Sequence, residues 1–202
     1  MFVLYHQAEL TAEAVATIGP DGLIEIFIGQ REPANAALLD FLAGSSLQIG
    51  IFLPGLAVLI AGQEFRGRQL GVTLLAVPRR GRLLAAKALA ATGYLLVTAI
   101  LVAAISTAFL YVAIRDWNPG LLLSADALTG HARFVGFAVL FSLVTFATTI
   151  IVRSALTGVV ATVVMIAIPM TQVLAGIAPA LDALFPVSAG RNLLLNGAMS
   201  EL

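Results

Sequence analysis

The sequence predicts an all-α protein: a polytopic bundle of transmembrane helices with four spans and a short amphipathic loop helix on the cytoplasmic side. Of its 202 residues, 60% are hydrophobic and only 11% are charged, whereas a soluble domain has roughly 25% charged residues. Four apolar runs come close to or exceed the roughly 20 residues that a helix needs to cross a bilayer. Between the first two runs, a short segment holds six of the eleven basic residues. We therefore expect the lipid bilayer to surround most of the chain.

Residues 1–40 are predicted to form an external N-terminal segment, because they hold six acids and a single base, Arg31. The run Gly19–Gly22 is a turn signal. The apolar run Leu23–Ile28 is too short to cross a bilayer, and it is either a short strand or a helix at the membrane surface. A helix cap is expected near Asn35, ahead of a stretch of alanine and leucine.

The first span is predicted over residues 41–62, which contain no charged side chain. Its small residues allow a neighbouring helix to approach closely in lipid. Pro54 lacks the backbone N–H that the helix would use, so we expect a bend at that point.

Residues 63–87 form a predicted loop in which bases far outnumber the one acid, Glu64. An excess of lysine and arginine marks the cytoplasmic side of a membrane protein, and we place the loop there. Apolar residues at helical spacing predict a short amphipathic helix over 69–77, with a face made by Leu70, Thr73, Leu74 and Val77. Pro78 is expected to end this helix.

The second span is predicted over residues 83–114, and Trp117 suits the interface where the chain leaves the membrane. Residues 120–132 are expected to form an external loop that contains Asp126 and His131. The third span is then predicted over residues 133–151.

Arg153 lies in the tight inner connection that follows. The fourth span is predicted over residues 156–175, with a kink at Pro169. The transmembrane domain is therefore 41–175. Residues 176–202 are expected to form an external C-terminal segment with short helices at the surface.

Several classes of function are disfavoured by the composition. The chain has no cysteine, which excludes a disulfide framework, a thiolate metal site and a cysteine nucleophile. Its zero net charge gives no electrostatic basis for binding nucleic acid. No acid lies inside a predicted span, which disfavours a proton-driven transporter. His6 and His131 are single histidines in external segments, where we expect solvated side chains rather than ligands.

The predicted loop resembles the first cytoplasmic loop of the permeases of ABC-2 type transporters in three pieces: Glu64-Phe65-Arg66, Thr73-Leu74-Leu75-Ala76-Val77-Pro78-Arg79-Arg80 and Leu83-Leu84-Ala85-Ala86-Lys87. It departs from that family where Arg68-Gln69 stands in place of a glycine and its partner. The run Leu184–Gly190 also resembles the external segment that such permeases carry before their last span. The resemblance covers about residues 40–195. Family permeases usually have six spans, and the match leaves the first and the last of them without a counterpart.

The resemblance implies a permease subunit of an ABC-2-like exporter, a multi-pass protein of the bacterial cell membrane. The apolar, uncharged surfaces of the predicted spans indicate a hydrophobic or amphipathic substrate. It implies two partners in the membrane and the cytoplasm: a second permease subunit, identical or different, and an ATP-binding cassette ATPase that holds the ATP and magnesium. The chain itself is not expected to be an enzyme, because it has no Gly-x4-Gly-Lys-Ser/Thr phosphate loop and no cofactor of its own. The residues expected to dock the ATPase are Glu64, Phe65, Arg66, Arg68, Thr73, Leu74, Leu75, Pro78, Arg79, Arg80 and Lys87.

Two other interpretations remain open. The basic loop could serve only to fix the topology and to contact lipid phosphate, which is also the alternative role of Arg79 and Arg80. The chain could instead be a non-transporting assembly or immunity protein that binds a partner within the bilayer. An intramembrane enzyme is a third and remote interpretation, which would require activity dependent on His131.

Overall fold

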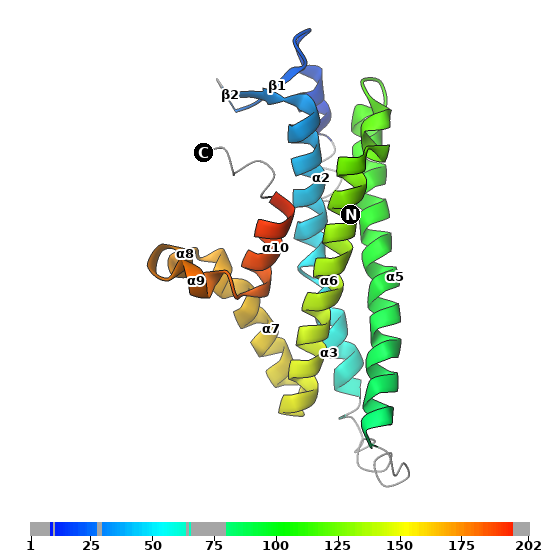
Figure 1. The fold of residues 1–202 in the computed structure, drawn as a ribbon, viewed down its shortest axis with the longest axis vertical. Coiled ribbons are helices and arrows are strands. Elements are labelled where there is room, and N and C mark those ends of the chain that lie inside the picture. The colour runs from blue at the N-terminus through cyan, green and yellow to red at the C-terminus, as the bar shows by residue number, and fades with distance from the viewer. Residues whose placement is uncertain (1–8, 10, 28–29, 64, 66–79, 196–202) are drawn as a thin grey trace. The chain divides into compact units, whose positions relative to one another are not determined.

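The structure is a computed structural model, and it describes residues 9, 11–27, 30–63, 65 and 80–195. Apart from one β-hairpin, the regular structure of these residues is helical (Figure 1). By its internal contacts the chain divides into two units. Unit 1 comprises Met1–Ile49, Leu101–Phe134 and Arg191–Leu202, and unit 2 comprises Gly50–Ile100 and Val135–Gly190.

The hairpin of unit 1 pairs β1 (Leu23–Phe27) with β2 (Gln30–Pro33) in antiparallel fashion. The predicted turn at Gly19–Gly22 is confirmed, because the Gly22 N–H donates to Gly19 O at 3.0 Å and Gly22 has a φ of 73°. Of the two alternatives for the run that begins at Leu23, the strand is confirmed. It buries Ile24 completely.

The first predicted span is two helices in the structure, α2 (Ala34–Gly50) and α3 (Leu53–Gln63). The interruption lies directly before Pro54, the second residue of α3, where a missing N–H is tolerated. The expected bend near Pro54 is therefore confirmed. The helix α2 begins at Ala34, one residue before the expected cap at Asn35 and seven residues before the predicted span.

The second predicted span is confirmed as α5 (Arg80–Ile114), a helix of 35 residues. A short 3-10 helix, η2 (Pro119–Leu123), connects it to α6 (Ala125–Val152). The expected external loop over 120–132 is thus wrong over most of its length, since α6 begins eight residues before the predicted Arg133. The reason is a cap: the Ser124 Oγ accepts the Ala127 N–H at 3.2 Å.

The fourth predicted span is shorter than expected. The helix α7 (Ala155–Met170) has 16 residues and ends one residue after Pro169, so Pro169 precedes a helix end rather than a kink. Two residues further on, Gln172 has a φ of 55°, which the helix cannot continue through. Three short helices follow, as expected for the tail: α8 (Val173–Ile177), α9 (Pro179–Asp182) and α10 (Pro186–Leu195).

The core of unit 1 joins elements that are distant in the sequence. Ile24 of β1 packs with α2, with the end of α5 and with η2, through the buried residues Leu38, Leu42, Leu110, Ile114 and Leu121. Trp117 is partly buried against this cluster. The hairpin and the short connection after α5 are therefore packed parts of the fold.

The core of unit 2 is made largely of small residues. Ala57 and Ala61 of α3 pack with Ala91 and Leu95 of α5 and with Phe146 of α6. Small side chains permit the close helix approach that stabilises helix pairs in lipid, where burial against another helix gains little over burial against acyl chains.

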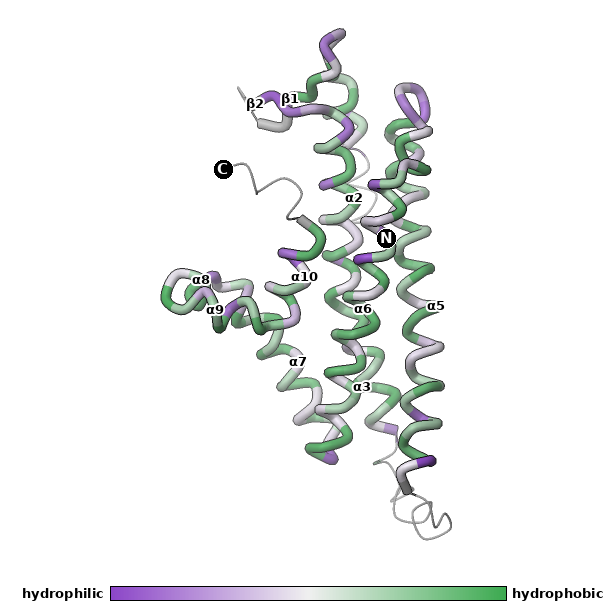
Figure 2. The backbone as a smooth tube through the Cα atoms, in the orientation of Figure 1, coloured by the Kyte–Doolittle hydropathy of each residue, from purple (hydrophilic) through white to green (hydrophobic). Residues whose placement is uncertain are grey.

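Three helical segments are long and apolar enough to cross a membrane: Ala34–Gln63, Gly81–Ile114 and Ala125–Val152. Hydrophobic residues dominate α5, α6 and α7 in Figure 2. Many large apolar side chains on these helices are exposed, such as Leu89, Leu140 and Leu156. The described residues therefore form a possible multi-pass membrane protein with three long helices and one shorter apolar helix.

Candidate functional site

Most of the loop that the sequence singled out lies outside the described residues. This applies to the expected docking residues Glu64, Arg66, Arg68, Thr73, Leu74, Leu75, Pro78 and Arg79, and to the predicted loop helix over 69–77. The structure describes the two anchor points of the loop: α3 ends at Gln63 and α5 begins at Arg80. The Phe65 N–H donates to Gly62 O at 3.1 Å, so a turn continues directly from α3.

Lys87 is the docking residue whose side chain the structure places against a cavity. It lies on the eighth position of α5 and lines a hollow of about 250 Å³ in unit 2 with Ile60, Tyr94 and Phe146. The remaining wall is alanine. A lysine that lines an apolar hollow can bury its methylene stem there and extend its ammonium group to the membrane surface.

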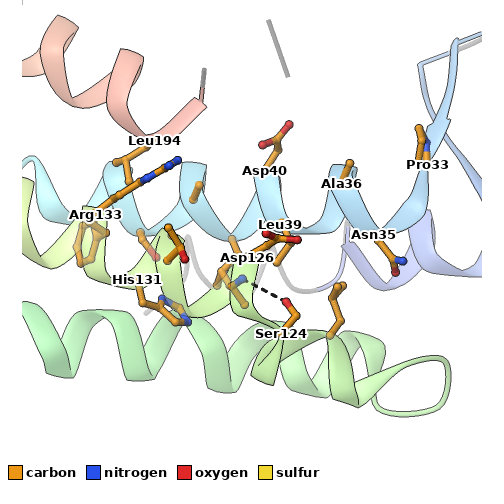
Figure 3. Close-up of a pocket in the computed structure, with 18 residues that line it drawn as sticks. Pro33, Asn35, Ala36, Leu39, Asp40, Ser124, Asp126, His131, Arg133 and Leu194 are labelled. Carbon is orange, nitrogen blue, oxygen red and sulfur yellow. Dashed lines mark hydrogen bonds between the residues drawn. The ribbon is translucent and has the colours of Figure 1, made fainter. Parts of the chain in front are cut away.

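A larger and more polar cavity, which was not predicted from the sequence, lies within unit 1. Its volume is about 570 Å³, and its walls come from α2, η2, the first turns of α6 and Leu194 of α10. Its polar lining includes Asn35, Asp40, Ser46, Asp126, His131 and Arg133 (Figure 3). Pockets of 300–1,000 Å³ are typical of sites for small molecules.

Two of the charged side chains on this wall face the cavity from different helices. Asp40 is half-buried and projects from α2, and Arg133 is exposed and projects from α6 (Figure 3). Within the part of the chain that the structure describes, neither side chain makes a hydrogen bond or an ion pair. Asp40 also corrects the expectation that no acid lies inside a span, because α2 begins earlier than predicted.

Asp126 has a local structural role. It stands in the first turn of α6, where a negative charge interacts favourably with the positive end of the helix dipole. Together with the Ser124 cap, it explains why α6 begins where it does.

His131 was expected to be a solvated surface residue, and this is wrong. It is half-buried in α6, and its Nε2 lies 3.0 Å from the Thr107 Oγ1 of α5. Since the Thr107 hydroxyl donates to Ala103 O at 2.8 Å, the Nε2 of His131 is the donor in the contact between them. His131 therefore fixes one wall of the cavity to α5.

Two further residues line this cavity. Ser46 is 1% exposed, and its buried Oγ has no hydrogen bond partner among the residues described. Gly130 has open space beside it, because a Cβ there would meet no atom within 4 Å.

The described residues contain no group of three or more histidine, aspartate or glutamate side chains that could hold a metal ion. Two sequence signals could have located the cavity residues. Ser124 followed by Asp126 is a helix start signal that places His131 in a helix. The expected cap near Asn35 likewise places Asp40 in a helix, although the predicted span began one residue after it.

Searches of models of protein families, of curated proteins and of solved structures give no match for this chain.

Proposed function

We propose that the chain is the membrane-spanning permease subunit of an ABC-2-like exporter, which moves a hydrophobic or amphipathic substrate outward. The observation that carries this proposal is the pattern from Glu64 to Lys87, a basic segment with a proline-terminated apolar run between two long apolar helices. A loop that only fixed the topology would need the charges but not the apolar run.

The length of α5 supports a loop that stands clear of the membrane. At 1.5 Å per residue, its 35 residues extend about 52 Å, which exceeds the roughly 30 Å of hydrocarbon by about 22 Å. Lys87 lies about 10 Å from the first residue of α5 by the same rise. The end of α5 that carries Arg80 can therefore extend beyond the hydrocarbon layer, where a soluble partner could reach it.

We assign the fourth crossing to α7 with the residues that follow it. Its 16 residues account for about 24 Å of the hydrocarbon thickness. The N–H groups of Thr171 and Gln172 both donate, to Ala167 O at 3.2 Å and to Pro169 O at 3.1 Å. The first two N–H groups after Met170 are therefore satisfied internally, as the membrane interior requires.

The ATP hydrolysis that drives transport would take place in a partner protein. The only lysine of the chain, Lys87, is followed by Ala88 and not by serine or threonine, so the chain has no phosphate loop. ATP and magnesium would be held by a cytoplasmic ATP-binding cassette ATPase that docks on the loop, with acids of the ATPase facing Arg79 and Arg80. A second permease subunit, identical or different, would complete the transporter.

Co-purification tests this proposal. The full chain, tagged and extracted from its native membrane in a non-ionic detergent, should retain an ATPase in equal amount. The triple variant Pro78→Ala, Arg79→Glu and Arg80→Glu should insert normally and lose the ATPase, because it removes the helix stop and reverses the two charges.

The matched control is Arg153→Gln, which removes a positive charge from the other inner connection and should leave the ATPase bound. Retention of the ATPase by the triple variant would contradict docking through this loop. Recovery of a different membrane protein without any ATPase would contradict the transporter and favour an assembly or immunity protein.

A further inference from the structure

The polar cavity of unit 1 holds opposite charges that do not neutralise each other. Asp40 stands on α2 and Arg133 on α6, both line the cavity, and no ion pair within 4.0 Å joins them. A ligand that carries charges of both signs can pair with the two groups at once. Asp126, the other acid on the wall, already has a role at the start of α6.

The size of the cavity argues for an occupant larger than one water. The cavity of about 570 Å³ is about nineteen times the ~30 Å³ that one water occupies in the liquid, so a single bridging water cannot fill it.

The position of the two charges along their helices indicates the source of the ligand. Asp40 follows the first residue of α2 by six positions, about 9 Å, and Arg133 follows the first residue of α6 by eight positions, about 12 Å. With each helix beginning at the outer edge of the headgroup layer, which is roughly 5–7 Å thick, the two charges lie about 2–7 Å below that layer, at the edge of the hydrocarbon. Arginine can extend its guanidinium back towards the surface.

We propose that this cavity binds a phosphate–ammonium zwitterion, either free or as the headgroup of a phospholipid. Asp40 accepts hydrogen bonds from the ammonium group, and Arg133 donates to the phosphate oxygens through its planar guanidinium, which matches an oxyanion in two-point contact. The proposal is independent of any ATPase partner.

Binding of three water-soluble probes to the full chain in a non-ionic detergent tests the pairing of charges. Phosphoethanolamine should bind in a saturable manner by calorimetry. Ethanolamine and inorganic phosphate each carry half of the zwitterion and should bind about tenfold more weakly or worse, because each loses one charge-assisted contact. Equal affinity for the three probes would overturn the proposal. It would also be overturned if the chain bound neither soluble phosphoethanolamine nor the same group as the headgroup of phosphatidylethanolamine.

Two charge variants test which residue contacts the ammonium end of the ligand and which contacts its phosphate end. Asp40→Asn should weaken phosphoethanolamine binding about tenfold and leave inorganic phosphate unchanged. Arg133→Gln should weaken phosphoethanolamine equally and leave ethanolamine unchanged. The matched controls are Asp116→Asn and Arg115→Gln, which alter the exposed ion pair of 3.4 Å after α5 and should leave all three probes unchanged. A loss as large in the controls as in the cavity variants would contradict the assignment.

A cavity-filling variant covers the case in which the charge variants fail to fold. Gly130→Leu places a side chain in the open space on the cavity wall and should abolish phosphoethanolamine binding. Gly44→Leu, at a glycine of α2 that also has open space but does not line the cavity, should bind as the original chain does. Undiminished binding by Gly130→Leu would overturn the proposal by itself.

A further experiment with lipid bilayers distinguishes a phospholipid headgroup from a free zwitterion. The chain is reconstituted in phosphatidylglycerol nanodiscs that contain a minor fraction of phosphatidylethanolamine, and the lipid retained after extraction is measured. Enrichment of phosphatidylethanolamine that Gly130→Leu abolishes supports a lipid headgroup. Binding of soluble phosphoethanolamine without such enrichment supports a free ligand.

Discussion

The contact between α3 and α7 gives the sharpest test of the packing described for unit 2. Gly62 stands on the last turn of α3, directly before the basic loop, and faces Ala155 at the start of α7. A Cβ added at Gly62 would lie 2.8 Å from the Ala155 Cβ and 3.8 Å from its Cα. Gly55, on the same helix, has open space, because a Cβ there would meet no atom within 4 Å.

The size of the effect follows from these distances. Two non-bonded carbons rest at about 3.5–4.0 Å, so Gly62→Ala requires the helices to separate by about 1 Å. Ala155 has no rotamer through which it could move aside, and the backbone must shift, at a cost of about 1–3 kcal/mol. Both alanine variants gain up to ~1 kcal/mol of helix propensity. The free energy of unfolding of Gly62→Ala should therefore be about 1–3 kcal/mol lower than that of Gly55→Ala.

Titration with SDS in mixed micelles, followed by far-ultraviolet circular dichroism, measures this difference. The Gly55→Ala variant serves as the matched control, since it makes the same chemical change on the same helix. Equal stability of the two variants, or a more stable Gly62→Ala, would refute the close approach of α3 and α7.

Two further changes test unit 1 by the same titration. Thr107→Val removes the acceptor of the His131 Nε2–H and should lower the free energy of unfolding by about 1 kcal/mol, and an unchanged midpoint would show that this bond is absent. Leu38→Ala truncates a fully buried side chain and should lower the free energy of unfolding by about 2 kcal/mol. This value is near the low end for such a change, because an unfolded helix in a micelle stays in apolar surroundings. Phe52→Ala, at a side chain that is 74% exposed, should change stability by less than about 0.5 kcal/mol, and a loss as large as that of Leu38→Ala would contradict the assigned core.

The long helices could be predicted because their signal is local. An uninterrupted apolar run is sufficient to specify α5, and a proline near the middle of a run is sufficient to place the break before α3. The short helices of the tail follow from closely spaced prolines. The hairpin could be anticipated only as one of two alternatives, because a run of six residues does not distinguish a strand from a surface helix.

The remaining differences have tertiary causes. The helix α2 extends back to Ala34 because its first turns pack Ala34, Ala37 and Leu38 into the core of unit 1, and Asp40 becomes helical with them. The end of α7 depends on Gln172 in a left-handed conformation, which glutamine rarely adopts, so composition gave no indication of it. The cavity arises from the way α2, η2 and α6 are brought together, and no single segment encodes it.

The central claim is that the arginine-rich loop between α3 and α5 faces the cytoplasm. The chain contains no cysteine, so single cysteines can be placed and labelled without background. In intact cells, a membrane-impermeant maleimide should label Asp116→Cys, at a side chain that is 92% exposed beyond the far end of α5. It should label Arg79→Cys only after the membrane is permeabilised. Labelling of Arg79→Cys from outside intact cells, with Asp116→Cys protected, would contradict the account.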